Sequence, residues 1–382
     1  MRFEDVPQLE MLYRIYNWLM NREKQPPFKL ILTPTDRCNL NCFFCPNSIA
    51  RKSGRFKESD ELSDEEWLKI IDDAIKIGVH DFIVLGGGEP LIRKDLVMKI
   101  FRRIKEKYNR AYFEIITNGT FLNDEDIIEI VDKEMSTLTI SIHGTSEKIY
   151  QQIMGDSKAF KKVISNLKKI KEAKERLNKF VPSVQINVVV NSLNYKDIPN
   201  MVEFFGKLGC EYLSFHYMRC YEDIQPIAKN FELTQDQLEK LKAQLQELSK
   251  ISEEKGIIIR SQTLENKLPF SSEEGLWFLK LRCYEPWYSI SIQPDGRVSR
   301  CAAFFTRKES VSIRDDTLEN IWYGNFFEEV RENVIKGVMM EGCSQCGLIS
   351  STNYIKSLFP LLLNFLKGNI TIAQIKNILR RR

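Results

Sequence analysis

The chain has 382 residues, of which 43% are hydrophobic and 28% charged, and its formal net charge at pH 7 is +4. This composition is typical of a globular protein, and the length allows one large domain with a smaller module. The small positive charge gives no support to nucleic-acid binding, so we expect no nucleic-acid partner. Nine cysteines without a secretory leader favour a cytoplasmic protein whose thiols bind metal or react, rather than form disulfides.

Residues 1–28 are expected to form a helical extension, and strands and helices alternate over residues 29–232. Six apolar runs have the length and residue types of buried strands: KLILTP at 29–34, DFIVLGG at 81–87, AYFEIIT at 111–117, TLTISIH at 137–143, VQINVVV at 184–190 and YLSFHYM at 212–218. Stretches with helical periodicity separate these runs. The alternation predicts an α/β fold with a parallel sheet, a partial (β/α)6 TIM-like barrel. In such barrels the functional residues lie at the C-terminal ends of the strands.

The pattern changes after the predicted barrel. Residues 233–280 are expected to form a charged helix and a connector, and residues 281–350 a small domain of turns, short strands and cysteines. The helical basic tail, residues 351–382, has its longest apolar run at 358–366, far below the roughly 20 residues of a membrane span. Interfacial contact of this tail with an anionic membrane is an alternative that we do not favour. We expect the tail to pack onto the barrel through Leu358, Leu362, Phe365 and Leu366.

Three cysteines, Cys38, Cys42 and Cys45, follow the first predicted strand in the segment RCNLNCFFCPN. Thiolates are the ligands that bind iron–sulfur clusters, and a closed structural site uses four of them. Three thiolates bind three irons of a cubane cluster and leave the fourth iron open for an amino and a carboxylate group. S-adenosylmethionine offers that pair, and an electron from the cluster would cleave it to an adenosyl radical. The alternative is a zinc site completed by a distant ligand.

Polar residues also follow the next three predicted strands. The second strand runs into LGGGEP, in which Gly87 and Gly88 let the backbone approach a ligand closely. The carboxylate of Glu89 can accept hydrogen bonds from an ammonium group. Asn118 follows the third strand, and Ser141 lies at the end of the fourth. These positions predict a binding site at the strand ends.

A second group of four cysteines lies in the small predicted domain: Cys283, Cys301, Cys343 and Cys346. The segment YSISIQPDGRVSR, residues 288–300, is typical of two strands joined by a tight turn, which brings the first two of these cysteines onto neighbouring strands. CSQC, residues 343–346, places the other two at one corner. Four thiolates make a closed site, and their spacing alone suits zinc and iron–sulfur equally.

The segment CNLNCFFC is similar to the signature loop of radical S-adenosylmethionine (radical SAM) enzymes, and LGGGEP resembles their glycine–glycine–glutamate motif. The resemblance implies that the three cysteines bind a [4Fe–4S] cluster. It also implies that Phe44 lies against the cofactor's adenine and that Gly87, Gly88 and Glu89 bind its methionine amino group. Ser141 then contacts the carboxylate or ribose, and we place Asn118 among the cofactor-binding residues.

The chain departs from that family after the fourth predicted strand. Where relatives carry arginines before a glycine, this chain reads YQQIMG, with Gln152 and Met154 at those places, so the group that binds the cofactor's carboxylate is not identified. His143 stands where many relatives have aspartate, and we interpret it as an ordinary hydrogen-bonded histidine. The C-terminal cysteines resemble a twitch domain, the shortened SPASM domain, which implies one auxiliary [4Fe–4S] cluster.

The resemblance implies an oxidoreductase. We expect hydrogen abstraction from a small hydroxylated or amino substrate, with an electron passed to the auxiliary cluster and a low-potential donor such as ferredoxin or flavodoxin. A peptide-modifying SPASM-type maturase, a redox-neutral epimerase and a non-catalytic iron–sulfur scaffold remain as alternatives. His216, Tyr217 and Arg219, at the end of the sixth predicted strand, are candidates to hold or deprotonate the substrate. A packing or surface role explains these three residues equally well.

Overall fold

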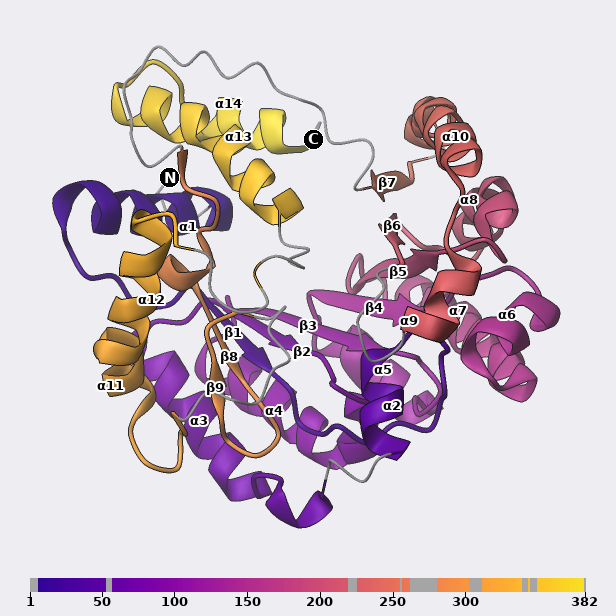
Figure 1. Cartoon of the computed structure of the whole chain (residues 1–382), viewed down its shortest axis with the longest axis horizontal. Helices are drawn as coiled ribbons and strands as arrows, with labels where there is room; N and C mark the ends of the chain where they lie inside the picture. Colours follow the sequence, from indigo (N-terminus) through magenta and orange to yellow (C-terminus); the bar gives the residue numbers. More distant parts are fainter. Residues whose placement is uncertain are drawn as a thin grey trace. The chain divides into compact units, whose positions relative to one another are not determined.

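The computed structural model describes residues 6–52, 57–218, 225–254, 256–261, 280–301, 311–338, 343 and 349–380 (Figure 1). Its strands are β1 (Lys29–Leu32), β2 (Asp81–Val84), β3 (Tyr112–Thr117), β4 (Thr137–Ser141), β5 (Ser183–Val190), β6 (Tyr212–Tyr217), β7 (Ile258–Ser261), β8 (Ser289–Ile292) and β9 (Val298–Ser299). Its α-helices are α1 (Pro7–Tyr16), α2 (Pro46–Lys52), α3 (Asp64–Ile77), α4 (Lys94–Lys107), α5 (Asp124–Asp132), α6 (Glu147–Met154), α7 (Ser157–Arg176), α8 (Ile198–Lys207), α9 (Gln225–Ala228), α10 (Gln235–Glu254), α11 (Leu318–Tyr323), α12 (Asn325–Ile335), α13 (Ile349–Leu366) and α14 (Ile372–Arg380). A π-helical turn, η2 (Asn17–Asn21), follows α1, and short 3-10 turns are η3 (Glu58–Asp60), η4 (Pro90–Arg93), η5 (Tyr195–Asp197), η7 (Lys229–Phe231) and η10 (Glu285–Trp287).

The chain divides into two compact units. The first contains Met1–Ile31, Glu65–Phe82 and Asn266–Arg382, and the second contains Leu32–Asp64 and Ile83–Glu265. Strands β1 and β2 each begin in the first unit and end in the second.

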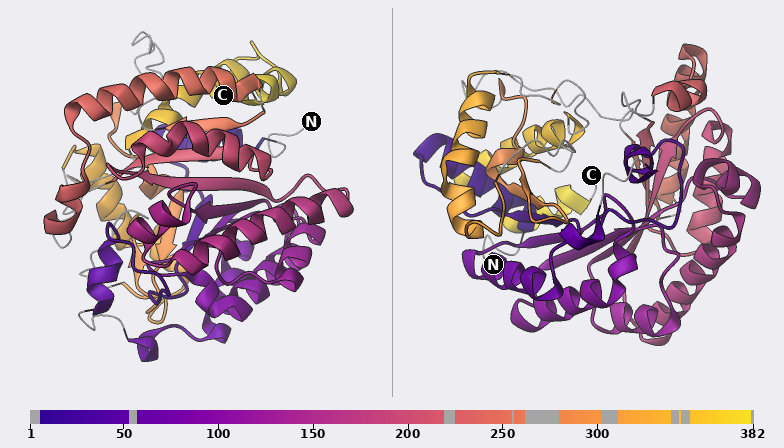
Figure 2. Two further views of the ribbon diagram at one scale, coloured as in Figure 1. Left: turned by 90° about the vertical axis from the view of Figure 1, so that its right-hand side faces the viewer. Right: turned by 60° about the horizontal axis from the view of Figure 1, so that its bottom comes forward.

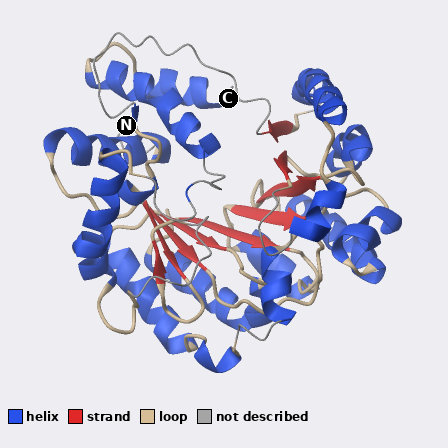
Figure 3. Ribbon diagram, in the orientation of Figure 1, coloured by secondary structure: helices blue, strands red, loops and turns tan. Residues whose placement is uncertain are grey.

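The second unit is built on a parallel sheet in which β3, β4, β5, β6 and β7 are successive neighbours. Helices α5, α7 and α8 lie on one side of these strands, as the colours of Figure 3 and both views of Figure 2 show. All six predicted strands are present, so the expected α/β fold is confirmed. The prediction missed a seventh parallel strand, β7, which lies in a region that we assigned to a helix and connector. Its segment is short and follows a long charged helix, and pairing with β6 gives it strand structure.

The two faces of this sheet differ in polarity. In β5 the side chains of Val184, Ile186 and Val188 are fully buried, whereas Gln185 and Asn187 on the other face are only partly buried. The parallel register aligns Gln185 with polar residues on both neighbouring strands, Thr139 of β4 and Tyr212 of β6. A continuous polar surface therefore follows the face of the sheet that its helices leave open.

The first unit contains the predicted hairpin, since β8 and β9 pair in antiparallel register. Its core is aromatic, and the Arg331 guanidinium is buried in it, 4.0 Å from the ring centre of Trp18 and 4.6 Å from that of Trp322. The guanidinium donates hydrogen bonds to the carbonyls of Pro286 at 2.9 Å and Trp322 at 3.0 Å. Within the described part of this unit, the Arg331 guanidinium forms no ion pair with a carboxylate. Cation–π contacts and two carbonyl acceptors stabilise its charge instead.

The structure shows what one helix of the tail contacts. Helix α13 lies against α1, in the first unit, with Leu358 and Leu362 fully buried. Leu366 is exposed, which corrects its assignment to the packed face. In the described chain, no helix combines the length and the apolar character that a membrane span needs.

Candidate functional site

Cys38, Cys42 and Cys45 lie in the second unit, in the loop between β1 and α2, and each residue is partly exposed. A tight turn brings the last two together, because the Cys45 N–H donates to the Cys42 carbonyl at 3.1 Å. Burial raises the pKa of the Cys42 thiol, and the two neighbouring thiols raise it further. Among the residues that the structure describes, no three His, Cys, Asp or Glu side chains already stand in metal-binding geometry. The donor set nevertheless fits an iron–sulfur cluster, because three mutually interacting thiols share one loop.

The cysteine loop is attached to the end of α6. The N–H groups of Asn41 and Phe43, on either side of Cys42, donate to the carbonyls of Met154 at 3.3 Å and Ile153 at 3.2 Å. Met154, which stands where relatives have an arginine, is buried. Helix α6 therefore supports the backbone of the loop and presents no cation there from this position.

The glycine-rich turn after β2 fits closely against the segment that leads into Cys38. The Gly88 N–H donates to the Thr35 carbonyl at 3.1 Å, and the Glu89 N–H donates to the Arg37 carbonyl at 2.7 Å. A Cβ atom on Gly88 would lie 2.5 Å from the carbonyl carbons of Asp36 and Arg37. Only glycine allows this approach of two backbones, which fixes the cysteine loop against the end of β2.

Glu89 is buried, and its carboxylate accepts three hydrogen bonds. Oε1 accepts from the Leu91 N–H at 3.0 Å and the Thr117 hydroxyl at 2.6 Å, and Oε2 accepts from the Asn118 N–H at 2.7 Å. Burial raises the pKa of this carboxyl, and the three donors oppose the rise. An ionised carboxylate has about four acceptor sites, two on each oxygen. Among the described residues no donor occupies the second site on Oε2, so this site can accept a hydrogen bond from a ligand.

Asn118 holds the cysteine loop with its side chain. Its Nδ2 donates to Oδ1 of Asn39 at 2.9 Å, and Asn39 in turn donates to the Thr120 hydroxyl at 3.0 Å. The Asn118 Oδ1 accepts from the Thr120 N–H at 3.0 Å and from its hydroxyl at 2.7 Å. These contacts connect the end of β3 to the residue after Cys38. Sequence reasoning identified Asn118 but not Asn39 or Thr120, because no spacing or motif marks them.

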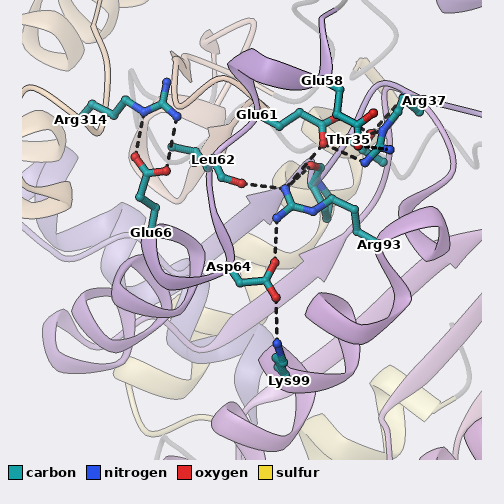
Figure 4. A network of polar contacts seen from close by, with 11 residues as sticks. Thr35, Arg37, Glu58, Glu61, Leu62, Asp64, Glu66, Arg93, Lys99 and Arg314 are labelled. Carbon is teal, nitrogen blue, oxygen red and sulfur yellow. Dashed lines mark hydrogen bonds and ion pairs between the residues drawn. The ribbon is translucent and has the colours of Figure 1, made fainter.

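A network of charged side chains surrounds the residues before Cys38 (Figure 4). Arg37 pairs with Glu58 at 2.6 Å and with Glu61 at 3.1 Å, and Thr35 donates to Glu61 as well. Arg93, in the turn after Glu89, donates to the carbonyls of Pro34 at 3.2 Å and Leu62 at 2.8 Å and pairs with Asp64 at 2.9 Å. The network joins the loops after β1 and β2. In the first unit, Figure 4 also shows Arg314 paired with Glu66 at 2.8 Å.

Phe44 lies near the end of β4, where its ring meets that of His143 edge-on with 5.0 Å between the ring centres. His143 is buried, and its Nδ1 accepts the Val189 N–H at 3.1 Å, which places the imidazole proton on Nε2. Burial, followed by the nearby His216, lowers the pKa of His143 to about 3. His143 is therefore a neutral hydrogen-bonded histidine. Ser141, at the end of β4, is partly buried and aligned with Asn187 of β5.

The candidate residues at the end of β6 have different surroundings. His216 is exposed and aligned with Val189 of β5. The Tyr217 side chain is partly buried, and burial raises its pKa to about 12. Arg219 lies outside the described residues. Val189 therefore links the two histidines: its N–H donates to His143, and it is the register partner of His216.

Sequence reasoning missed one cation at this site, Arg51 of α2. Its Nη1 donates to the carbonyls of Asp36 at 3.3 Å and Gly87 at 3.4 Å. Its charge lowers the pKa of both the Cys38 and Cys42 thiols, against the larger effect of burial. Beside it, Asn47 donates to the same Gly87 carbonyl at 2.6 Å. Nothing in the sequence marks Arg51 as a site residue, because a basic residue in a short polar segment is usually a surface residue.

The second cysteine group lies in the first unit, where Cys283, Cys301 and Cys343 are partly exposed and Cys346 lies outside the described residues. Burial raises the pKa of the Tyr288 hydroxyl, and Glu285 and then the thiols of Cys283 and Cys301 raise it further. Both thiols therefore lie near one side chain at the start of the hairpin. Cys283 lies before β8 and Cys301 follows β9, so neither cysteine lies on a strand as predicted, and that these two cysteines bind one cluster stays a prediction.

Comparisons with known proteins agree with this arrangement. The model of the radical SAM superfamily matches residues 32–205, and that of SPASM, an iron–sulfur cluster-binding domain, matches residues 283–347. The chain is 25% identical over 312 residues to PqqA peptide cyclase of Granulibacter bethesdensis, covering 78% of this chain and 75% of that protein. It is 30% identical over 192 residues to a probable GTP 3',8-cyclase of Thermococcus kodakarensis, covering 50% of this chain and 57% of that protein.

Two solved structures have a similar fold. Streptococcus suis SuiB bound to S-adenosylmethionine has a TM-score of 0.65 at 18% identity, covering 85% of this chain and 72% of that one. The structure described as native anSMEcpe with bound AdoMet has a TM-score of 0.60 at 17% identity, covering 90% of this chain and all (100%) of that one.

The first match identifies a radical SAM domain at residues 32–205, and the three-cysteine loop lies within it. The second match identifies a SPASM iron–sulfur domain at residues 283–347, which contains the second cysteine group. These two domains imply [4Fe–4S] clusters together with S-adenosylmethionine.

Proposed function

We propose that this protein cleaves S-adenosylmethionine reductively and oxidises its substrate by two electrons. The observation that carries this proposal is the presence of two cysteine groups in one chain, three thiols at the barrel's strand ends and four in the SPASM region. When bound, a [4Fe–4S] cluster with S-adenosylmethionine supplies an adenosyl radical that removes a hydrogen atom from the substrate. A second, fully thiolate-bound cluster suits acceptance of the electron that remains after the substrate also loses a proton.

Cys38, Cys42 and Cys45 bind three irons in this proposal. The fourth acceptor site of the Glu89 carboxylate receives the cofactor's ammonium group, because the other three sites are already occupied by protein donors. Phe44 contacts the adenine. Asn118 holds Asn39 with its side chain and so also positions the cysteine loop, and its role as a cofactor-binding residue stays a prediction.

Arg51 is the group that we propose for the cofactor's carboxylate. It lies between the thiol loop and the glycine-rich turn, it contacts only carbonyls there, and it forms no ion pair with a carboxylate in the described chain. The guanidinium of Arg51 has further N–H donors and lies next to the proposed ammonium site. It is therefore suited to bind the carboxylate of the cofactor's methionine group. It would replace the arginine that relatives carry on α6.

His216 is the proposed proton acceptor. It is exposed at the C-terminal end of β6, on the polar face of the sheet, where a substrate can reach it. His143 is unsuited to this role, because a pKa of about 3 makes it a weak base and burial removes it from solvent. Its contact with Phe44 makes it a support for the adenine-binding ring.

A peptide is the substrate class that the comparisons favour. The similarity to PqqA peptide cyclase extends over 78% of the chain, whereas that to the GTP cyclase extends over 50%. A similarly folded SuiB structure is described as bound to the precursor peptide SuiA. A small hydroxylated or amino substrate is the second candidate, because the polar residues Thr139, Gln185 and Asn187 line the open face of the sheet.

The test is anaerobic reconstitution with iron and sulfide, followed by reduction in the presence of S-adenosylmethionine. We expect 5′-deoxyadenosine and methionine from the wild-type protein and neither from the triple variant Cys38→Ala, Cys42→Ala, Cys45→Ala. A matched variant, Cys283→Ala with Cys301→Ala, should keep the cleavage and lose substrate oxidation. Cofactor cleavage by the triple variant would refute the proposal.

Substrate oxidation is measured by mass spectrometry with peptides encoded next to this gene and with small amino and hydroxylated compounds. Loss of two hydrogens from a peptide supports the first candidate, and the same loss from a small compound supports the second. Turnover of the correct substrate without any net oxidation would contradict the two-electron reaction.

A further inference from the structure

The hydroxyl group of Tyr150, in α6, is buried and has no hydrogen-bond partner in the described chain. Its ring is fixed in the core, edge-on to Phe160 with 5.5 Å between the ring centres. A buried hydroxyl is normally hydrogen-bonded, and one without a partner in the protein indicates that something outside the polypeptide accepts its proton.

The position of Tyr150 on α6 directs it toward the cysteine loop. Residues three and four positions apart share a face of a helix, so Tyr150 lies on the same face as Ile153 and Met154, and all three are buried. The carbonyls of those two residues accept the N–H groups on either side of Cys42. Cys42 therefore packs against the turn of helix that carries Tyr150.

Electrostatics supports the same placement. Burial raises the pKa of the Tyr150 hydroxyl, and the largest further contribution comes from Cys42, followed by Asp156, Glu89 and Cys38. The hydroxyl thus lies among the thiols and the carboxylate of the proposed cofactor site. It remains protonated there at neutral pH and is a hydrogen-bond donor.

We propose that the Tyr150 hydroxyl donates a hydrogen bond to a sulfide of the cluster that Cys38, Cys42 and Cys45 would bind, an acceptor outside the polypeptide. This inference rests on the proposed function only in requiring a cluster at that loop. A hydrogen bond to a cluster sulfur withdraws electron density and stabilises the reduced form, so it raises the reduction potential. Tyr150 is accordingly a positioning residue that tunes how readily the cluster accepts the electron needed for cofactor cleavage.

The experiment compares reconstituted wild-type protein with Tyr150→Phe, which removes only the hydroxyl. In redox titrations followed by electron paramagnetic resonance, the midpoint potential of the first cluster should shift to a more negative value. The midpoint of the auxiliary cluster should stay unchanged. Tyr112→Phe is the matched control, because that hydroxyl donates to Glu114 and Thr137 at the opposite end of β3 and should leave both midpoints unchanged.

A second variant keeps the proposal testable if Tyr150→Phe fails to retain its cluster. Replacement of Tyr150 by 3-fluorotyrosine preserves the shape and strengthens the donor, so the first midpoint should shift to a less negative value. In deuterium oxide, the reduced cluster of the wild-type protein should also show an exchangeable deuteron coupling that Tyr150→Phe lacks.

Unchanged midpoints in the loaded variants would overturn the hydrogen bond. Failure of the wild-type protein to bind a cluster at the three cysteines would instead overturn the proposed function, so the two failures are distinguishable.

Discussion

The close contact at Gly88 gives a sharp test of how the cysteine loop is positioned. In Gly88→Ala the new Cβ would lie 1.9 Å from the Arg37 carbonyl oxygen and 2.5 Å from the carbonyl carbons of Asp36 and Arg37. Non-bonded carbons require about 3.5 Å, so the two backbones must separate by at least about 1 Å. The contact is with backbone on both sides, and no side-chain rotation can relieve it.

The separation would break the two hydrogen bonds that join these segments. The Gly88 N–H to Thr35 carbonyl distance is 3.1 Å and the Glu89 N–H to Arg37 carbonyl distance is 2.7 Å, so an added ångström takes both beyond hydrogen-bonding range. Two lost bonds at about 1 kcal/mol each, with overpacking strain of about 1–3 kcal/mol, predict a destabilisation of about 3–5 kcal/mol. Displacement of Cys38 by about 1 Å should also reduce cofactor cleavage about 100-fold.

The assay is urea unfolding under anaerobic conditions, with iron content and cofactor cleavage measured on the same samples. Gly87→Ala is the control, because its Cβ would meet the Asp36 carboxylate, a side chain that can rotate away. We expect a clearly smaller loss of stability in that variant. Equal stability of the two variants, or a Gly88→Ala protein as stable as the wild type, would refute the argument.

Three further predictions follow from the site and the core. Glu89→Gln should weaken S-adenosylmethionine binding by about 1.5–3 kcal/mol with little change in iron content, because it removes the carboxylate's charge; equilibrium dialysis that finds equal affinities would contradict this. The pKa of His143 is about 3 in the folded protein and about 6.5 in the unfolded chain, so only the unfolded chain binds a proton between these pH values. The free energy of unfolding should therefore be unaffected by His143 above pH 6.5 and should fall below it by about 1.4 kcal/mol per pH unit. Nuclear magnetic resonance of the chain's 3 histidines, with His143→Gln for assignment, checks this, and a His143 midpoint near 6.5 would disprove it. Arg331→Met should destabilise the first unit by about 2–5 kcal/mol, because it leaves the carbonyls of Pro286 and Trp322 without a donor. Arg331→Lys should lose less stability. Thermal unfolding that shows no loss of stability in the methionine variant would argue against a stabilising role of the buried cation.

The strands and the three-cysteine loop could be recognised in the sequence because their signals are local. Apolar runs of β-branched residues identify a buried strand, and the spacing of Cys38, Cys42 and Cys45 is visible within one loop. The contacts that hold this loop could not be predicted in the same way. Asn39 and Arg51 are ordinary polar residues in the sequence, and only the folded chain brings them to Asn118 and Gly87.

Strand β7 and the partner of the tail helix could not be predicted for the same reason. Strand β7 is short and acquires its structure by pairing with β6, a partner that no local pattern reveals. The sequence predicts an apolar face on the tail, but it does not show that helix α13 lies against α1, which is far away in the sequence. Periodicity shows that a helix has an apolar face, and it does not show which element covers that face.

The pairing of α1 with α13 has a consequence for synthesis on the ribosome. Roughly 330 residues separate the two helices, so at about 5–20 residues per second α1 waits on the order of 20–60 s for its partner to emerge. During that interval the apolar side chains of Leu9, Leu12 and Ile15, all buried in the finished protein, lack this cover. The first unit therefore reaches its final packing only after translation of the second unit is complete.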